Sequence, residues 1–157
     1  MIYRPKIRIG VIGGARPSQS SKQHAYRVGQ LVAEKGAVLV CGGLKGTMEA
    51  AAKGAKEKGG LTIGILPGEN PGEANPYIEI AIATGIGYSR NALVVMNADV
   101  LIAIDGQYGT LTEIAYACIQ NKKVIGLGTW NIEGIIPVFS PEEAVDAALK
   151  EFYPLVR

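Results

Sequence analysis

The sequence predicts an α/β protein with a doubly wound, Rossmann-like fold. We expect a three-layer sandwich around a mainly parallel sheet of about six or seven strands. Short runs rich in Ile and Val alternate with longer amphipathic stretches, as in chains that alternate strand and helix. The short runs are apolar throughout, which indicates strands covered on both faces. The length suits one domain, so residues 1–157 are predicted to form a single Rossmann-like unit.

The first part of the chain predicts strands that are each followed by a helix. The helix at 19–35 carries apolar residues at the spacing of one buried face, and Gly36 is a typical C-terminal stop. A second helix follows Thr47 and runs to about Lys58. The strands expected in this part are Lys6–Ile12, Ala37–Cys41 and Leu61–Leu66.

After a Pro/Gly-rich surface loop at 67–76, the same alternation resumes. The last helix begins after Ser140, because the run Ser-Pro-Glu-Glu supplies an N-cap, a Pro at the first helical position and a capping-box Glu. The other helices expected here are Tyr88–Asn97 and Gly109–Gln120. The expected strands are Tyr77–Thr84, Asp99–Ile104, Lys123–Leu127 and Ile135–Phe139.

Composition excludes several classes of protein. No uncharged apolar stretch approaches the ~18 residues that a membrane span needs. Two distant cysteines and one histidine predict neither a disulfide framework nor a metal site. The basic residues are dispersed, and the aromatic residues show no stacking pattern for nucleic acid. We therefore expect a cytoplasmic protein without a membrane or nucleic-acid partner.

Charge is unevenly distributed along the chain. Residues 1–58 contain 11 Lys and Arg against 3 acids, whereas residues 59–157 contain 5 against 11. Two interpretations remain open. The chain has two differently solvated faces, or its basic part lies around an anionic ligand.

One pattern occurs twice and carries the predicted chemistry. Residues 38–49 read VLVCGGLKGTME and residues 101–113 read LIAIDGQYGTLTE. Each is a strand, a Gly-x-x-Gly-Thr turn and a helix expected to have Glu in its first turn. Such a turn favours phosphate at the helix start, although packing alone also explains the glycines. With the loop at 13–20, the predicted ligand- or phosphate-binding residues are Gly14, Ser18, Gly42, Gly43, Gly46, Thr47, Gly106, Gly109 and Thr110.

Arg90 and Glu113 are the candidate catalytic residues. An acid near a helix start usually just complements the macrodipole, and an isolated Arg is usually a surface residue. If the sheet brings them together, Arg90 can hold a phosphate or orient Glu113. Glu113 can then stabilise a cationic sugar transition state.

Over residues 6–150 the sequence resembles the lysine-decarboxylase-like superfamily. This group includes the LONELY GUY cytokinin-activating phosphoribohydrolases and the molybdenum-cofactor carrier proteins, and the short chain is closest to the carrier-like branch. The matching motifs are CGGLKGTMEAAAKGA at 41–55, GGLTIGILPG at 59–68, Tyr88–Asn91 and Asp105–Glu113. Asp105 and Gln107 replace the Pro and second Gly of the family's Pro-Gly-Gly-x-Gly-Thr-x-x-Glu motif, and Asn91 replaces its Lys.

The resemblance implies a phosphorylated, nucleotide-like small molecule as ligand, with Gly109 and Thr110 at the phosphate. Our first interpretation is a binding protein for such a molecule, of which a molybdopterin-type cofactor is one candidate, with no required cofactor. The enzymatic alternative is a nucleoside 5′-monophosphate phosphoribohydrolase that cleaves the N-glycosidic bond with Arg90 and Glu113. A scaffold with packing glycines is the third. No pyridoxal phosphate site is visible, so lysine decarboxylation is not expected.

Apolar helix surface predicts a homodimer or homotetramer. The run Ala92–Met96 and the face formed by Ile114, Ala117 and Cys118 exceed what one sheet face of a small monomer needs. The resemblance also implies an oligomer.

Overall fold

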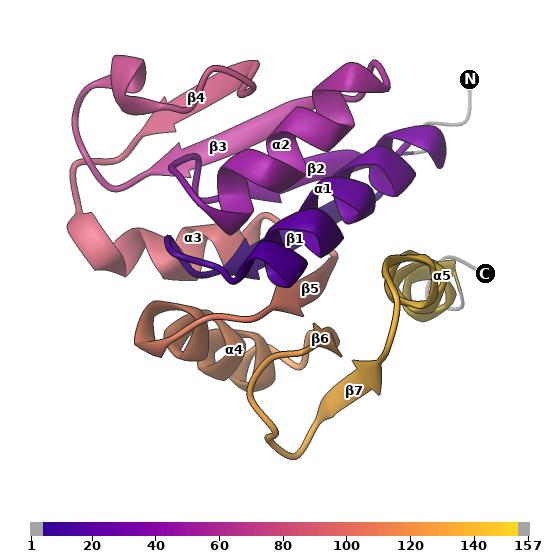
Figure 1. Cartoon of the computed structure of the whole chain (residues 1–157). Helices are drawn as coiled ribbons and strands as arrows, with labels where there is room; N and C mark the ends of the chain where they lie inside the picture. The colour runs from indigo at the N-terminus through magenta and orange to yellow at the C-terminus, as the bar shows by residue number, and fades with distance from the viewer. Residues whose placement is uncertain (1–4, 154–157) are drawn as a thin grey trace.

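The computed structural model describes residues 5–153 and contains one sheet of seven strands, all of them parallel. The strand order is β4-β3-β2-β1-β5-β6-β7, so the chain winds outward in one direction from β1 and then in the other from β5 (Figure 1). The strands are β1 Arg8–Gly13, β2 Val38–Cys41, β3 Thr62–Leu66, β4 Ile80–Ala83, β5 Val100–Ile104, β6 Val124–Leu127 and β7 Ile135–Val138.

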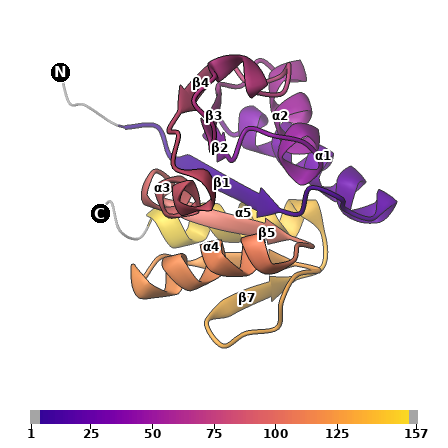
Figure 2. The same ribbon diagram turned by 90° about the vertical axis from the view of Figure 1, so that its left-hand side faces the viewer.

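Helices cover both faces of this sheet. They are α1 Gln19–Glu34, α2 Thr47–Glu57, α3 Asn91–Met96, α4 Tyr108–Ile119 and α5 Pro141–Phe152, with short 3₁₀ turns η1 Pro71–Glu73 and η2 Gly87–Arg90. One buried cluster joins α1, α2 and α5 to the sheet, and a second joins α3 and α4 to the opposite face (Figure 2). The predicted three-layer α/β fold is confirmed, and the sheet is entirely parallel.

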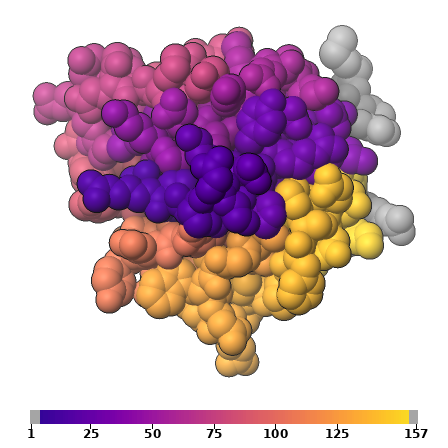
Figure 3. Space-filling model, in the orientation of Figure 1, coloured from indigo at the N-terminus to yellow at the C-terminus, as the bar shows by residue number. Residues whose placement is uncertain are grey.

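Helices α1 and α2 lie in unusually close contact. A Cβ atom on Gly29 of α1 would lie 1.9 Å from the carbonyl oxygen of Ala51, and one on Gly54 of α2 would lie 2.0 Å from that of Tyr26. The backbones therefore touch where no other residue fits. On the other side of α1, Arg27 pairs with Glu142 of α5 at 3.0 Å, which places the yellow α5 against the indigo α1 (Figure 3).

Several element boundaries differ from those predicted. The helix predicted at 88–97 is the 3₁₀ turn η2 followed by the six-residue α3, and the predicted strand 77–84 is shortened to Ile80–Ala83. Helix α4 begins at Tyr108. Glu113 therefore lies in its second turn, and the prediction of a first-turn acid was wrong at this position.

The apolar face predicted to be an oligomer interface is partly internal. Ile114 and Ala117 are buried against the sheet within one chain, whereas Cys118 is exposed. An apolar helix face that packs on its own sheet has the same periodicity as one that packs on another subunit. The exposed apolar side chains on α3 and α4 are instead Met96, Tyr108, Tyr116 and Ile119.

The change of winding direction lies between β1 and β5, which pair from Ile9 with Val100 to Gly13 with Ile104. Loops after neighbouring strands diverge at such a switch point and leave a crevice at the carboxyl ends of the strands, where open α/β sheets bind ligands. Among the helices of residues 5–153, none has the length and apolar character to cross a membrane.

Candidate functional site

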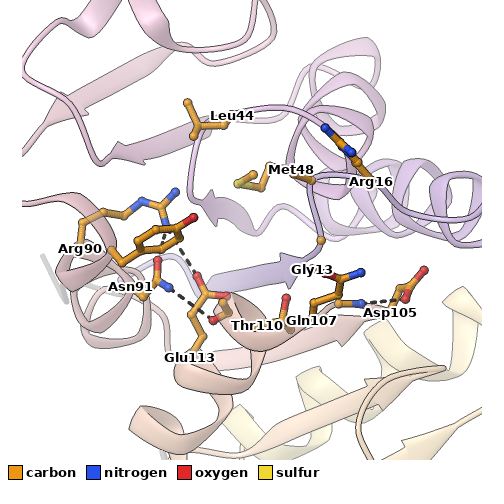
Figure 4. Close-up of a pocket in the computed structure, with 15 residues that line it drawn as sticks. Gly13, Arg16, Leu44, Met48, Arg90, Asn91, Asp105, Gln107, Thr110 and Glu113 are labelled. Carbon is orange, nitrogen blue, oxygen red and sulfur yellow. Dashed lines mark hydrogen bonds and ion pairs between the residues drawn. The ribbon is translucent and has the colours of Figure 1, made fainter.

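A cavity of about 480 Å³ lies at this switch point, within the usual size of a small-molecule site. Its walls come from the loops after β1, β2 and β5, the turn η2 and the starts of α2, α3 and α4 (Figure 4). The lining residues are Gly13, Gly14, Ala15, Arg16, Leu44, Met48, Tyr88, Arg90, Asn91, Asp105, Gly106, Gln107, Gly109, Thr110 and Glu113.

The structure brings together six of the eleven predicted site residues. Those that line the cavity are Gly14, Arg90, Gly106, Gly109, Thr110 and Glu113. Five others are not part of the lining, and these are Ser18, Gly42, Gly43, Gly46 and Thr47. The two Gly-x-x-Gly-Thr turns therefore occupy different positions relative to the cavity.

The second turn, before α4, is open toward the cavity. Its N-cap residue Gln107 makes no side-chain cap, and a Cβ atom on Gly109 would meet nothing within 4 Å. Within the described part of the chain, the N–H groups of residues 108–110 have no hydrogen-bond acceptor. Unpaired N–H groups at the start of a 12-residue helix favour an anion.

The first turn, before α2, is closed by the protein itself. The N–H of Thr47 donates to the carbonyl of Gly14 at 3.0 Å, and the Thr47 side chain is fully buried. A Cβ atom on Gly46 would lie 2.5 Å from the carbonyl oxygens of both Gly14 and Ala15. This turn therefore supports the loop after β1 from behind.

The remaining predicted glycines have packing contacts. A Cβ atom on Gly42 would lie 2.7 Å from Nη2 of Arg90, and one on Gly43 would lie 2.7 Å from the Leu66 side chain. Gly42 therefore leaves room for the Arg90 guanidinium. Ser18 caps α1, because its hydroxyl oxygen accepts a hydrogen bond from the N–H of Ser21 at 3.1 Å.

Arg90 and Glu113 point toward one another across the end of the cavity (Figure 4), with Arg90 Nη1 3.9 Å from Glu113 Oε1. Asn91 ties this pair to α4. Its Oδ1 accepts from Arg90 Nη1, and its Nδ2 donates to the Thr112 hydroxyl at 3.0 Å and to the carbonyl of Gly109 at 3.3 Å. Asn91, where the family motif has Lys, thus holds the guanidinium against the open turn.

Both members of the pair are buried, at 7% and 6% exposure. Burial raises the pKa of Glu113 to about 8, and the nearby Arg90 opposes the rise. Burial likewise lowers the pKa of Arg90, and Glu113 opposes that shift. Arg90 stays cationic at neutral pH because the ordinary pKa of a guanidinium lies far above neutral, while Glu113 is largely protonated. This end of the cavity therefore carries net positive charge.

The raised pKa of Glu113 predicts that the free energy of unfolding falls as pH rises. Between about pH 4.5 and 8 the folded protein holds a carboxyl proton that the unfolded chain releases. The folded state binds more protons in this window, so stability is lost as pH increases through it, by a few kcal/mol in order of magnitude. Urea unfolding at pH 5, 6.5 and 8 measures this loss.

Two variants serve as comparison in that experiment. Glu113→Gln removes the titrating group and is expected to flatten the pH dependence. Glu133→Gln removes an exposed acid and is expected to keep the wild-type slope. Equal slopes in Glu113→Gln and wild type would show that Glu113 titrates normally.

Nine of the fifteen lining residues were not among the predicted site residues, and three of these nine are Leu44, Met48 and Tyr88. Leu44 and Met48 form an apolar wall, and Tyr88 is 85% exposed beside the opening. The sequence did contain one signal for such a lining residue, because Leu44 is an apolar residue inside a glycine turn. Burial raises the pKa of the nearby Cys41 thiol to about 11, so it is a neutral thiol at pH 7 and a poor nucleophile.

Comparison with known proteins places this chain in a family and identifies proteins that share its fold. Residues 6–150 match the SLOG cluster4 family. A protein from Archaeoglobus fulgidus, described as uncharacterised, is 48% identical over 89% of this chain and 93% of its own length. A rice protein described as a probable cytokinin riboside 5′-monophosphate phosphoribohydrolase is 30% identical over 81% of this chain, but the match spans only 55% of the rice protein.

Solved structures match over nearly the whole chain. The molybdenum cofactor binding protein from Rippkaea orientalis has a TM-score of 0.90 at 36% identity, covering 94% of this chain and 98% of that one. The molybdenum cofactor carrier protein from Chlamydomonas reinhardtii has a TM-score of 0.88 at 30% identity, covering 95% and 99%. The resemblance predicted from the sequence motifs is confirmed.

Proposed function

The chain belongs to the SLOG cluster4 family, and we propose that it binds a phosphorylated, nucleotide-like small molecule in the cavity between β1 and β5. A molybdopterin-type cofactor is the leading candidate, because the neighbouring structures of matching length include molybdenum cofactor binding and carrier proteins. The ligand phosphate lies at the α4 turn, on Gly109 and Thr110.

The observation that carries this proposal is a buried cation without a full set of partners. Arg90 lines the cavity, and its Nε has no hydrogen-bond acceptor among the described residues. Such a donor is costly to bury unless a ligand pairs with it. Gly109 and Thr110 of the uncapped α4 turn line the same cavity, so these residues fit the phosphate-bearing end of the ligand.

A second candidate function is hydrolysis of the N-glycosidic bond of a nucleoside 5′-monophosphate. The arrangement that favours it is the buried pair of Arg90 and Glu113 beside the open turn. Arg90 would hold the phosphate or orient the acid, and Glu113, once ionised, would stabilise the cationic sugar of the transition state. The rice relative with this printed activity is matched over only about half its length.

Incubation with a panel of nucleoside 5′-monophosphates, followed by chromatography of the free base, separates the two functions. A carrier releases no base, yet its melting temperature rises with a nucleotide or pterin ligand. A hydrolase releases base, and Glu113→Gln abolishes the release while phosphate binding survives. If neither base release nor a rise in melting temperature occurs, the cavity does not bind this class of ligand.

We further propose that the chain forms a homodimer or homotetramer through α3 and α4. Met96 and Ile119, at 56% and 75% exposure, give this face the apolar character that a second copy would cover. Sedimentation velocity at micromolar concentration is expected to show more than one chain per particle. A monomer would refute the proposal.

A further inference from the structure

Asp105 places a carboxylate at the end of the cavity opposite Arg90 (Figure 4). It directly follows β5 and has a φ of 54°, an uncommon value for a residue other than glycine. Its Oδ1 accepts a hydrogen bond from the N–H of Gly106 at 2.8 Å, and its Oδ2 accepts from the N–H of Ser18 at 3.2 Å. Its carbonyl accepts from the Thr129 hydroxyl at 2.7 Å. The residue is therefore fixed by both its backbone and its side chain.

These hydrogen bonds occupy the donors that an anion would otherwise use at this corner. The N–H of Ser18 belongs to the loop before α1, and that of Gly106 belongs to the turn before α4. The two loops are adjacent, since a Cβ atom on Gly14 would lie 3.5 Å from the Cα of Gly106. A phosphate here would have to displace the carboxylate or lie beside its negative charge.

The opposite end of the cavity has the reverse character. Arg90 has a donor without an acceptor there, and Thr110 of the uncapped α4 turn lies between Arg90 and Asp105 (Figure 4). Arg16 is a further cation of the lining, but its side chain is exposed at the opening and is screened by solvent. The cavity thus has one end that attracts an anion and one end already occupied by an anion of the protein.

We propose that Asp105 determines specificity by closing its corner of the cavity to anions. The ligand then carries one phosphate, bound at the α4 turn, and presents an uncharged hydrogen-bond donor such as a hydroxyl or amino group to Asp105. This inference rests on the proposed phosphate site, and it assigns a role to a residue that departs from the family motif.

Titration calorimetry with orthophosphate and pyrophosphate tests the inference. Asp105→Asn removes the charge and keeps the shape, and Asn tolerates a positive φ. Asp146→Asn makes the same charge change on the exposed side of α5 and serves as the matched control. We expect Asp105→Asn to bind pyrophosphate about tenfold more tightly than the wild type does. Asp146→Asn is expected to match the wild type for both anions.

Each outcome separates this inference from the proposed function. If orthophosphate binds all three proteins and Asp105→Asn gains nothing for pyrophosphate over Asp146→Asn, the role of Asp105 is refuted and the phosphate site stands. If neither anion binds the folded wild type or Asp105→Asn, the phosphate site itself is refuted. Should Asp105→Asn fail to fold by circular dichroism, Asp105→Gly replaces it, because Gly adopts the required φ freely.

Discussion

Replacing Arg90 with methionine is expected to weaken binding of a nucleoside 5′-monophosphate about 100-fold, close to 3 kcal/mol, while the protein stays folded. The variant removes the buried cation whose Nε lacks an acceptor among the described residues. It does not leave a buried charge without a partner at neutral pH, because Glu113 is largely protonated at that pH. Methionine also fills most of the vacated space beside Met48. Calorimetric titration at pH 7 and a urea melt provide the two readouts.

Two further variants make that result specific. Lys150→Met removes an exposed cation of α5 and is expected to leave affinity unchanged. Arg90→Lys keeps the charge but loses the planar donor fork, and its affinity should fall between those of wild type and Arg90→Met. If Arg90→Met stays folded and binds the nucleotide as wild type does, the phosphate does not contact Arg90.

The second large effect concerns stability and the two similar glycine turns. Gly46→Ala is expected to lower the free energy of unfolding by about 3 kcal/mol. Gly46 has a φ of 73°, and the new Cβ would lie 2.5 Å from two backbone carbonyl oxygens. Backbone cannot yield as a flexible side chain does, so the loop after β1 must shift.

Gly109→Ala, at the equivalent position of the second turn, is the matched comparison. Its Cβ would meet nothing within 4 Å and lies in a helix, so stability should be kept or slightly raised. The methyl group instead occupies the space where an anion approaches the N–H groups, and phosphate affinity should fall. Equal destabilisation by the two substitutions in urea melts would show that the turns are equivalent after all.

The fold could be predicted because its determinants are local. Apolar runs mark each buried strand, and residues such as Ser140 signal helix starts by short-range hydrogen bonds that the sequence displays directly. The start of α4 has no such signal. Its N-cap is Gln107 without a cap hydrogen bond, and the predicted helix accordingly began one residue late, at Gly109.

The site could be predicted only in part, because long-range packing decides which of the two similar glycine turns is open to the cavity. Nothing in the sequence of residues 42–47 shows that the carbonyls of Gly14 and Ala15 cover it. The same reason explains Ile114, whose apolar character fits a core or an interface equally well. Asp105 is the clearest case: its charge was visible in the motif, but its hydrogen bond to Ser18 spans 87 residues of sequence.

The wholly parallel sheet also constrains the order in which the strands pair during folding. No pair of its strands is joined by a hairpin, so every pairing must close a long loop. The pairing of the central strand β1 with β5 is completed late, since Ile9 meets its partner Val100 only after two-thirds of the chain has left the ribosome. Until then one edge of β1 is open to misassembly. The crevice proposed to bind the ligand is bounded by that same late pairing, so such a ligand would bind to and stabilise the product of this slow step.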